Sequence, residues 1–121
     1  MPIVDVEVVA VDAELTPRPA VGALASSLGQ VFGSAPGRTW VRLRIFPASC
    51  YAENDSPVSA ETLPVFVTVL QAASPQGAEL QAQVLAVTQA VAVWLGMPQE
   101  RVHVGYAPPA AGRQAFGGKL A

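Results

Sequence analysis

Cysteine and histidine are nearly absent from the sequence, which has one of each, Cys50 and His103, among 121 residues. A single cysteine cannot form a disulfide within the chain, and an unpaired thiol suits a reducing compartment, so we expect a cytoplasmic protein. One histidine and one thiol also supply too few ligands for a transition-metal site. We therefore expect no metal, and the sequence indicates no other cofactor.

Charge of either sign is also scarce: 13% of the residues are charged, and the formal net charge is −2. Without a basic surface to neutralise phosphates, the chain is not expected to bind nucleic acid. Acidic residues interrupt the first apolar stretch and no basic residue precedes it, so we expect neither a signal peptide nor a membrane anchor. A small molecule or another protein chain remains as the expected partner.

The common motifs of enzyme sites are missing, including a P-loop, a strand-linked GxGxxG, HExxH, CxxC and a nucleophile elbow. Apolar residues are plentiful, at 51% of the chain. A chain of this length buries roughly two thirds of the surface that its unfolded state exposes. Residues 1–121 are therefore expected to form a single domain without disulfides.

Hydrophobic periodicity predicts a strand, a helix and a second strand in the first half of the chain. The strands are expected over residues 3–10 and 39–46. The helix is expected over about 17–32, opened by Thr16 as a cap and Pro17 in the first turn. Alternation in the second strand predicts Val41, Leu43 and Ile45 on one face and Trp40, Arg42 and Arg44 on the other.

The second half repeats this order. Strands are expected over residues 64–70 and 102–107, on either side of a long helix. Ser74 and Pro75 are expected to open this helix, and Gly96 to end it. The helix residues expected to point into the core are Leu80, Val84, Leu85, Val91 and Leu95, with Trp94 also assigned to the core.

The two halves resemble each other in detail. Pro2 begins PIVDVEV and Pro64 begins PVFVTVL, and Val41 and Val102 follow these prolines at nearly equal distances. This spacing indicates a β-α-β unit that occurs twice. The expected segments are an internal repeat at residues 2–47 and 64–108 and a C-terminal ribbon at 111–121.

Two such units side by side give an α/β (α+β) fold, with a four-stranded mixed sheet and two helices on one face. The opposite face of the sheet would then expose apolar and charged side chains to solvent. We therefore expect an oligomer in which the sheets of several chains close around each other.

Pro2 directly follows the initiator methionine. Removal of Met1 would convert the nitrogen of Pro2 into a secondary amine. Burial or a nearby cation lowers the pKa of an amine, so that it can accept a proton near neutral pH. Many chains begin with Met-Pro and make no use of the proline, so both interpretations stay open at this point. Pro64 is an internal imide and cannot act as a base.

Pro2 and the C-terminal stretch VHVGYAPPAAGRQAFGGKLA, with its Gly112 turn and its Phe116-Gly117-Gly118 ending, resemble 4-oxalocrotonate tautomerase. The whole chain is similar to the fused β-α-β-β-α-β members of the tautomerase superfamily, which include macrophage migration inhibitory factor. This resemblance implies a homotrimer of six β-α-β units and keto–enol chemistry on small carbonyl compounds. It also implies active sites near Pro2, at the subunit boundaries.

The same resemblance implies roles for individual residues. In the family, a strand arginine in a V-R-V pattern binds the substrate carboxylate; its position is Arg42 in the first half and His103 in the second. Asp12 stands where an arginine would follow the first strand. The lysine that some relatives place before the second strand is missing, although Arg38 is close by. A dicarboxylate clamp of the family's usual kind is therefore not expected.

Structural roles compete with these assignments. Asp5 and Glu7 lie on the strand beside Arg42 and Arg44 and can form a cross-strand charge ladder with them. A guanidinium also suits a planar carboxylate, and Trp40 offers an apolar wall beside it. Both interpretations of the two arginines remain open.

Three further positions have two interpretations each. His103 is either an ordinary strand residue or part of the pocket, and Phe116 is expected to pack, with the pocket of a neighbouring subunit as one possible place. The loop over residues 47–63 is either a polar connector or a lid. In the second case its Glu53, near Tyr51, would position a water molecule.

The function predicted from the sequence is that of a tautomerase. Pro2 would remove a proton next to the carbonyl of a small 2-oxo or 2-hydroxy-enoic acid and return it at another carbon. Arg42, helped by Arg44 or His103, would hold the carboxylate or the enolate oxygen. The alternatives are a decarboxylase or dehalogenase on the same fold, or a non-enzymatic, cytokine-like trimeric binding protein.

Overall fold

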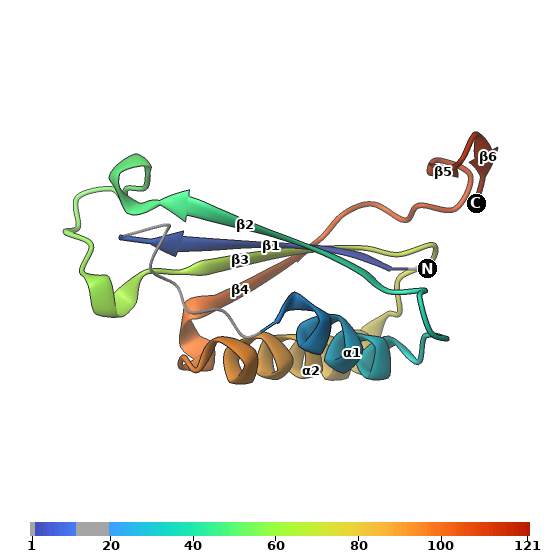
Figure 1. Cartoon of the computed structure of the whole chain (residues 1–121), viewed down its shortest axis with the longest axis horizontal. Helices are drawn as coiled ribbons and strands as arrows, with labels where there is room; N and C mark the ends of the chain where they lie inside the picture. The colour runs from blue at the N-terminus through green and yellow to red at the C-terminus, as the bar shows by residue number, and fades with distance from the viewer. Residues whose placement is uncertain (1, 12–19) are drawn as a thin grey trace.

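The computed structural model describes residues 2–11 and 20–121; the predictions for Asp12, Thr16 and Pro17 lie outside these residues. A four-stranded mixed sheet in the order β2-β1-β3-β4 carries helices α1 and α2 on one face (Figure 1). The strands are β1 (Ile3–Ala10), β2 (Trp40–Pro47), β3 (Val65–Leu70) and β4 (Val102–Tyr106), and the helices are α1 (Val21–Phe32) and α2 (Gly77–Leu95).

The two halves of the chain have the same pattern of strand pairing. β1 pairs in parallel with β2, starting with Ile3 opposite Trp40, and β3 pairs in parallel with β4, starting with Val65 opposite Val102. β1 and β3 run antiparallel and join the two units at the centre of the sheet. Each helix connects the strands of one parallel pair, which cannot be joined by a tight turn. The mixed sheet predicted from the repeat is thus confirmed.

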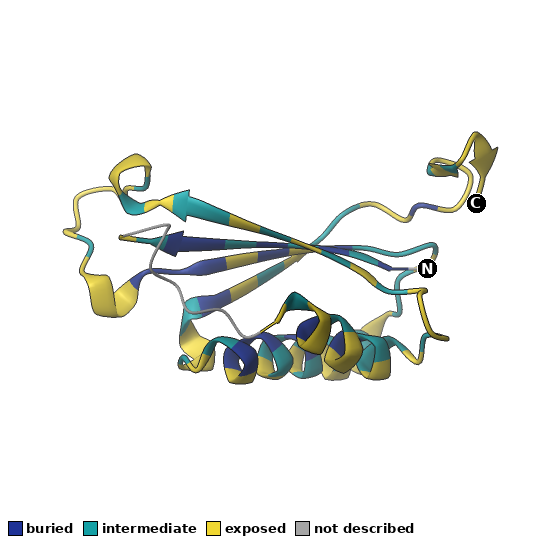
Figure 2. Ribbon diagram, in the orientation of Figure 1, coloured by how far each residue is buried: buried dark blue, intermediate teal, exposed yellow. Residues whose placement is uncertain are grey.

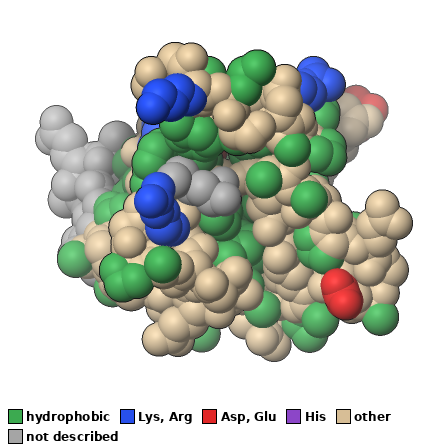
Figure 3. All heavy atoms as spheres, turned by 90° about the vertical axis from the view of Figure 1, so that its right-hand side faces the viewer, with side chains coloured by type: hydrophobic (Ala, Val, Ile, Leu, Met, Phe, Trp, Pro, Cys, Tyr) green, Lys and Arg blue, Asp and Glu red, His purple; other side chains and the backbone are tan. Residues whose placement is uncertain are grey.

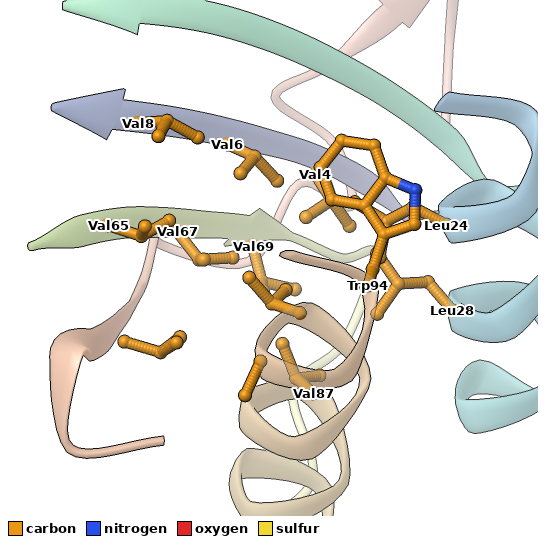
Figure 4. Packing of buried hydrophobic residues seen from close by; sticks show 13 residues of the cluster. Val4, Val6, Val8, Leu24, Leu28, Val65, Val67, Val69, Val87 and Trp94 are labelled. Carbon is orange, nitrogen blue, oxygen red and sulfur yellow. The ribbon is translucent and has the colours of Figure 1, made fainter. Parts of the chain in front are cut away.

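Alternate valines of the two central strands form the sheet side of the core, and every one of them is at most 5% exposed. They pack against Leu24 and Leu28 of α1 and against Val87 and Val91 of α2 (Figures 2 and 4). Burial of each such side chain contributes about 1.5–3 kcal/mol to folding. The strand residues are Val4, Val6, Val8, Val65, Val67 and Val69.

Helix α2 differs from the prediction at its start and on one face. It begins at Gly77 rather than directly after Ser74 and Pro75, because Gly77 has a left-handed φ of 60° and Gln76 before it is extended, so helical conformation does not continue N-terminally. Leu85 was predicted to point inward but is 45% exposed. The reason is that Leu85 stands two positions from the buried Val87, which places it about 200° away around the helix.

Helix α2 is unusually apolar, and part of its apolar surface packs into the core. With 19 residues and a mean hydropathy of 1.2, the helix meets the length and composition of a membrane span. One of its faces, however, completes the core through Val91, Ala92 and Trp94. The indole nitrogen of Trp94 donates a hydrogen bond to the carbonyl of Ala20 at 3.1 Å, which ties α2 to the start of α1. Gly96 ends the helix in the left-handed conformation, as predicted.

The sheet face opposite the helices is not covered by any element that the structure describes (Figure 1). Strand β2 divides its side chains as predicted, with Val41, Leu43 and Ile45 packed toward the core. We call the uncovered side the open sheet face. Its side chains come from all four strands: Ile3, Asp5, Glu7, Trp40, Arg42, Arg44, Phe66, Thr68 and His103.

The C-terminal segment extends beyond β4 and ends in a small antiparallel ribbon that projects from the body of the molecule (Figure 1). The N–H of Ala110 donates to the carbonyl of Gln71 at 2.7 Å and so attaches this segment to the end of β3. The ribbon strands are β5 (Ala115–Phe116) and β6 (Lys119–Leu120), and the short 3₁₀ turns are η1 (Ala48–Cys50), η2 (Ala60–Thr62) and η3 (Gln99–Arg101).

Candidate active site

Pro2 is buried at the wall of a cavity of about 480 Å³, at the end of the sheet where β1 begins. The cavity lies between the end of α1, the turn before β2 and the segment after β3. Figure 3 views this end of the molecule, where hydrophobic side chains and a few basic ones lie among other side chains and backbone. The lining residues are Pro2, Phe32, Gly33, Ser34, Arg38, Gln71, Ala72 and Ala73.

Hydrogen bonds and a left-handed glycine fix the backbone around this cavity. The carbonyl of Pro2 accepts the N–H of Trp40 at 3.0 Å, which extends the β1–β2 ladder to the first described residue. Gly33 ends α1 with a left-handed φ of 64°, so the chain turns into the cavity wall at Ser34. The hydroxyl of Thr39 donates to Ser34 Oγ at 2.7 Å.

Arg38 is the charged side chain among the described residues that line the cavity. Ser34 and Gln71 add a hydroxyl and an amide, and the ring of Phe32 with the two alanines supplies an apolar wall. The cavity therefore combines one cation and a few hydrogen-bonding groups with apolar surface. This composition suits a small anionic molecule, because a guanidinium can bind a carboxylate through two hydrogen bonds.

The strand arginines lie away from this cavity within one chain. Side chains two residues apart on a strand lie on the same face of the sheet, so Pro2, like Val4, faces the helices. Arg42 and Asp5 point to the open sheet face. Arg42 donates from Nε and Nη2 to the two carboxylate oxygens of Asp5, at 2.5 and 2.9 Å. The hydrogen bond from Arg42, together with its charge, lowers the pKa of Asp5 despite the partial burial of that carboxyl.

Arg44 also lies on the open sheet face, with its Nε 3.7 Å from a carboxylate oxygen of Glu7. The cross-strand charge ladder that competed with a substrate-binding role is therefore present in the single chain. Side chains of both arginines are about two thirds exposed, at 66% for Arg42 and 65% for Arg44. Exposed pairs of this kind contribute little to stability, because water and salt screen them.

His103 lies at the edge of the open sheet face rather than near Pro2. Its ring lies 5.8 Å from that of Phe66, which in turn lies 6.1 Å from the ring of Tyr51. The hydroxyl of Tyr51 donates to Glu53 at 2.6 Å, and this hydrogen bond is the main cause of the raised pKa of Tyr51.

The loop over residues 47–63 lies at the far end of the sheet from Pro2 (Figure 1). The eight residues of β1 separate the two places by about 25 Å. This loop therefore does not cover the Pro2 cavity of its own chain, and Glu53 does not reach it.

Trp40 and Phe116 contact each other edge to face, with ring centroids 5.5 Å apart and planes at 79°. The indole nitrogen of Trp40 donates to the carbonyl of Gly37 at 3.0 Å. Phe116 thus packs, as expected, and in this chain its partner is Trp40 rather than the cavity. The contact links the C-terminal ribbon to the start of β2.

Of the residues singled out from the sequence, the structure thus places Pro2 and Arg38 together and sets Arg42, Arg44 and His103 apart from them. Gln71 and Ser34 were missed. Gln71 directly follows a predicted strand and Ser34 lies in the turn after a predicted helix, where a polar residue is ordinary. Their common cavity depends on the pairing of β1 with β3, which neither local sequence pattern reveals.

No protein-family model and no curated protein matches the chain. Solved structures do resemble it. A fused 4-OT wild-type asymmetric trimer has a TM-score of 0.75 and 15% identity, over 98% of this chain and 94% of that one. A fused 4-OT wild-type symmetric trimer has a TM-score of 0.61 and 25% identity, over 89% and 86%.

A third structure, the macrophage migration inhibitory factor from Trichinella spiralis, has a TM-score of 0.73 and 11% identity, over 98% of this chain and 99% of that one. The agreement extends over nearly the whole length of both proteins and includes the paired β-α-β units described above. The chain therefore has the fold of the tautomerase superfamily.

Proposed function

We propose that this chain is a tautomerase in which Pro2, exposed as an amine by removal of Met1, is the general base. The reaction is keto–enol proton transfer on a small 2-oxo or 2-hydroxy-enoic acid. One observation carries the proposal: Pro2 is buried in a cavity whose charged lining residue, among those described, is the cation Arg38.

The mechanism follows from these surroundings. Burial and the charge of Arg38 both disfavour a second positive charge, so they lower the pKa of the Pro2 amine. The neutral amine removes a proton from the carbon next to the carbonyl, and the electron pair of the broken C–H bond moves onto the carbonyl oxygen. Arg38 holds the carboxylate or the developing enolate oxygen. Pro2 then returns the same proton to a different carbon. With an enol substrate, Pro2 instead takes the proton of the hydroxyl group, whose oxygen becomes the carbonyl, and the electron pair of the C=C bond takes the proton back at carbon.

In this proposal Arg38 has the substrate-binding role that the resemblance implied for Arg42. Arg42, Arg44 and His103 would contribute only to the cavity of another subunit. We propose a homotrimer, since two of the similar structures are described as trimers and the open sheet face exposes Phe66 and Trp40. We also propose a cytoplasmic location and no membrane attachment, in keeping with the free, exposed thiol of Cys50.

The first experiment measures the intact mass of the protein and then its turnover of phenylenolpyruvate and 2-hydroxymuconate. The variant Pro2→Ala removes the proposed base. Pro64→Ala is the matched control, because Pro64 stands at the equivalent place of the second β-α-β unit as an internal imide. Loss of Met1 and of activity in Pro2→Ala alone supports the proposal. Equal rates in Pro2→Ala and the unaltered protein would favour a binding protein.

A further inference from the structure

Pro2 directly precedes β1 and Gln71 directly follows β3, at the same end of this antiparallel pair. The pairing of β1 with β3 ends with Ile3 opposite Leu70, so the next pair along the same register is Pro2 and Gln71. Both residues line the same cavity. Directly opposed residues of antiparallel strands have Cβ atoms about 4.5–5.5 Å apart, so their side chains are neighbours.

The side-chain oxygen of Gln71 is buried and has no hydrogen-bond donor within the part of the chain that the structure describes. The backbone around it is held firmly. The carbonyl of Gln71 accepts the N–H of Ala110 at 2.7 Å, and that of Ala72 accepts the N–H of Ala111 at 3.1 Å. Buried acceptors without a donor are rare because they lose the hydrogen bonds that water would provide. A donor is therefore expected to reach Oε1 from within the cavity.

We propose that Gln71 Oε1 accepts a hydrogen bond from the protonated nitrogen of Pro2, and that Gln71 is a positioning residue for this base. The inference rests on the proposed function, since Pro2 must first become an amine. A protonated secondary amine has two N–H donors, one more than the neutral form. The neutral amine can already donate its single N–H to Gln71, which orients the nitrogen. The hydrogen bond becomes stronger once Pro2 has taken up a proton and carries a positive charge.

The charged and polar groups that face Pro2 act in opposite directions. Arg38 disfavours the protonated amine, whereas an acceptor such as Gln71 favours it. The carbonyl end of α1, at Phe32 and Gly33, also lines the cavity and carries partial negative charge. Gln71 is therefore expected to raise the pKa of the Pro2 amine relative to a cavity that lacks this acceptor, which favours uptake of the proton.

The test is an NMR titration of the Pro2 nitrogen in protein labelled with ¹⁵N-proline. Intact mass must first show that Pro2 is the first residue, after methionine aminopeptidase treatment where needed. Gln71→Leu removes the acceptor and Gln71→Glu replaces it with an anion of the same size. Gln81→Leu, at an exposed position of α2, is the matched control.

We expect Gln71→Leu to lower the pKa of Pro2 by about one unit and Gln71→Glu to raise it by at least as much, with no change in Gln81→Leu. The acid limb of kcat/KM should move in the same two directions. Unchanged values in both Gln71 variants, or shifts of the same sign, would overturn the inference. So would a higher KM with an unchanged pKa, which would make Gln71 a substrate contact.

These outcomes separate the inference from the proposed function. If Pro2→Ala retains full activity while the two Gln71 variants shift the pKa in opposite directions, the proposed function fails and the Gln71–Pro2 hydrogen bond stands. If Pro2→Ala is inactive and the Gln71 variants leave the pKa unchanged, the proposed function stands and the role of Gln71 fails.

Discussion

Arg42 binds Asp5 through two hydrogen bonds across the parallel pair of β1 and β2, on the sheet face that the helices leave open. The resemblance seen in the sequence implied a substrate-binding role for this arginine. The pair with Asp5 uses two of the five N–H donors of the guanidinium, those on Nε and Nη2. In the single chain, therefore, Arg42 is paired with Asp5 on the open sheet face, and Arg38 is the cation at Pro2.

The Asp5–Arg42 pair should make stability depend on pH. Because the pKa of Asp5 is lowered from 3.8 in the folded protein, the pair stabilises the fold above about pH 4, and this contribution is lost as pH falls through the lowered pKa. Asp5→Asn should melt about 1–3 °C lower than the unaltered protein at pH 7 and at nearly the same temperature at pH 2. Glu61→Gln, at an exposed position, is the control, and thermal melts followed by circular dichroism measure the difference. A constant gap at all pH values would contradict this account.

Substitution of Arg38 should weaken substrate binding. Arg38→Gln removes the cation from the Pro2 cavity, so KM for a carboxylate substrate should rise about 10-fold to 100-fold, as expected for loss of a charged hydrogen bond. Arg42→Gln is the informative comparison under the same steady-state assay. If Arg42→Gln raises KM and Arg38→Gln does not, the substrate carboxylate is held by a strand arginine of a neighbouring subunit.

The open sheet face should mediate assembly. Phe66 is 38% exposed there, and Phe66→Asp would place a charge next to Glu7, its cross-strand neighbour. We expect the unaltered protein to sediment as a trimer and Phe66→Asp to sediment as a smaller species in analytical ultracentrifugation. Val93→Asp, on the outer face of α2 where Val93 is 81% exposed, should leave the trimer intact. A trimer that persists in Phe66→Asp would place the interface elsewhere.

Two leucines of the helices should differ sharply in their effect on stability. Leu24 is completely buried in α1, so Leu24→Ala should lower the free energy of unfolding by about 2–5 kcal/mol. Leu85 lies on the outer face of α2, and Leu85→Ala should cost less than about 1 kcal/mol. Urea unfolding of the two variants and of the unaltered protein measures these differences in the free energy of unfolding. A large loss in Leu85→Ala would mean that another surface covers it.

Much of the fold was predictable because its signals are local. The alternation in β2 assigned Leu43 to the core and Arg44 to the opposite face, and the structure agrees. Gly96 ended α2 as predicted, since a left-handed residue after a helix is a local requirement that glycine meets best. The start of α2 was wrong because Ser74 and Pro75 have the composition of a helix start, while the left-handed turn at Gly77 decides where the helix begins.

The sequence by itself determined the strand and helix order, the internal repeat and the two faces of each strand, because periodicity of two or 3.6 residues is visible along a single chain. The tertiary structure alone decided which residues share the cavity with Pro2. Arg38 arrives there from the turn after α1, and Gln71 from the end of β3, through the antiparallel register of β1 and β3. That register depends on contacts between residues far apart in the chain, and no local pattern records them.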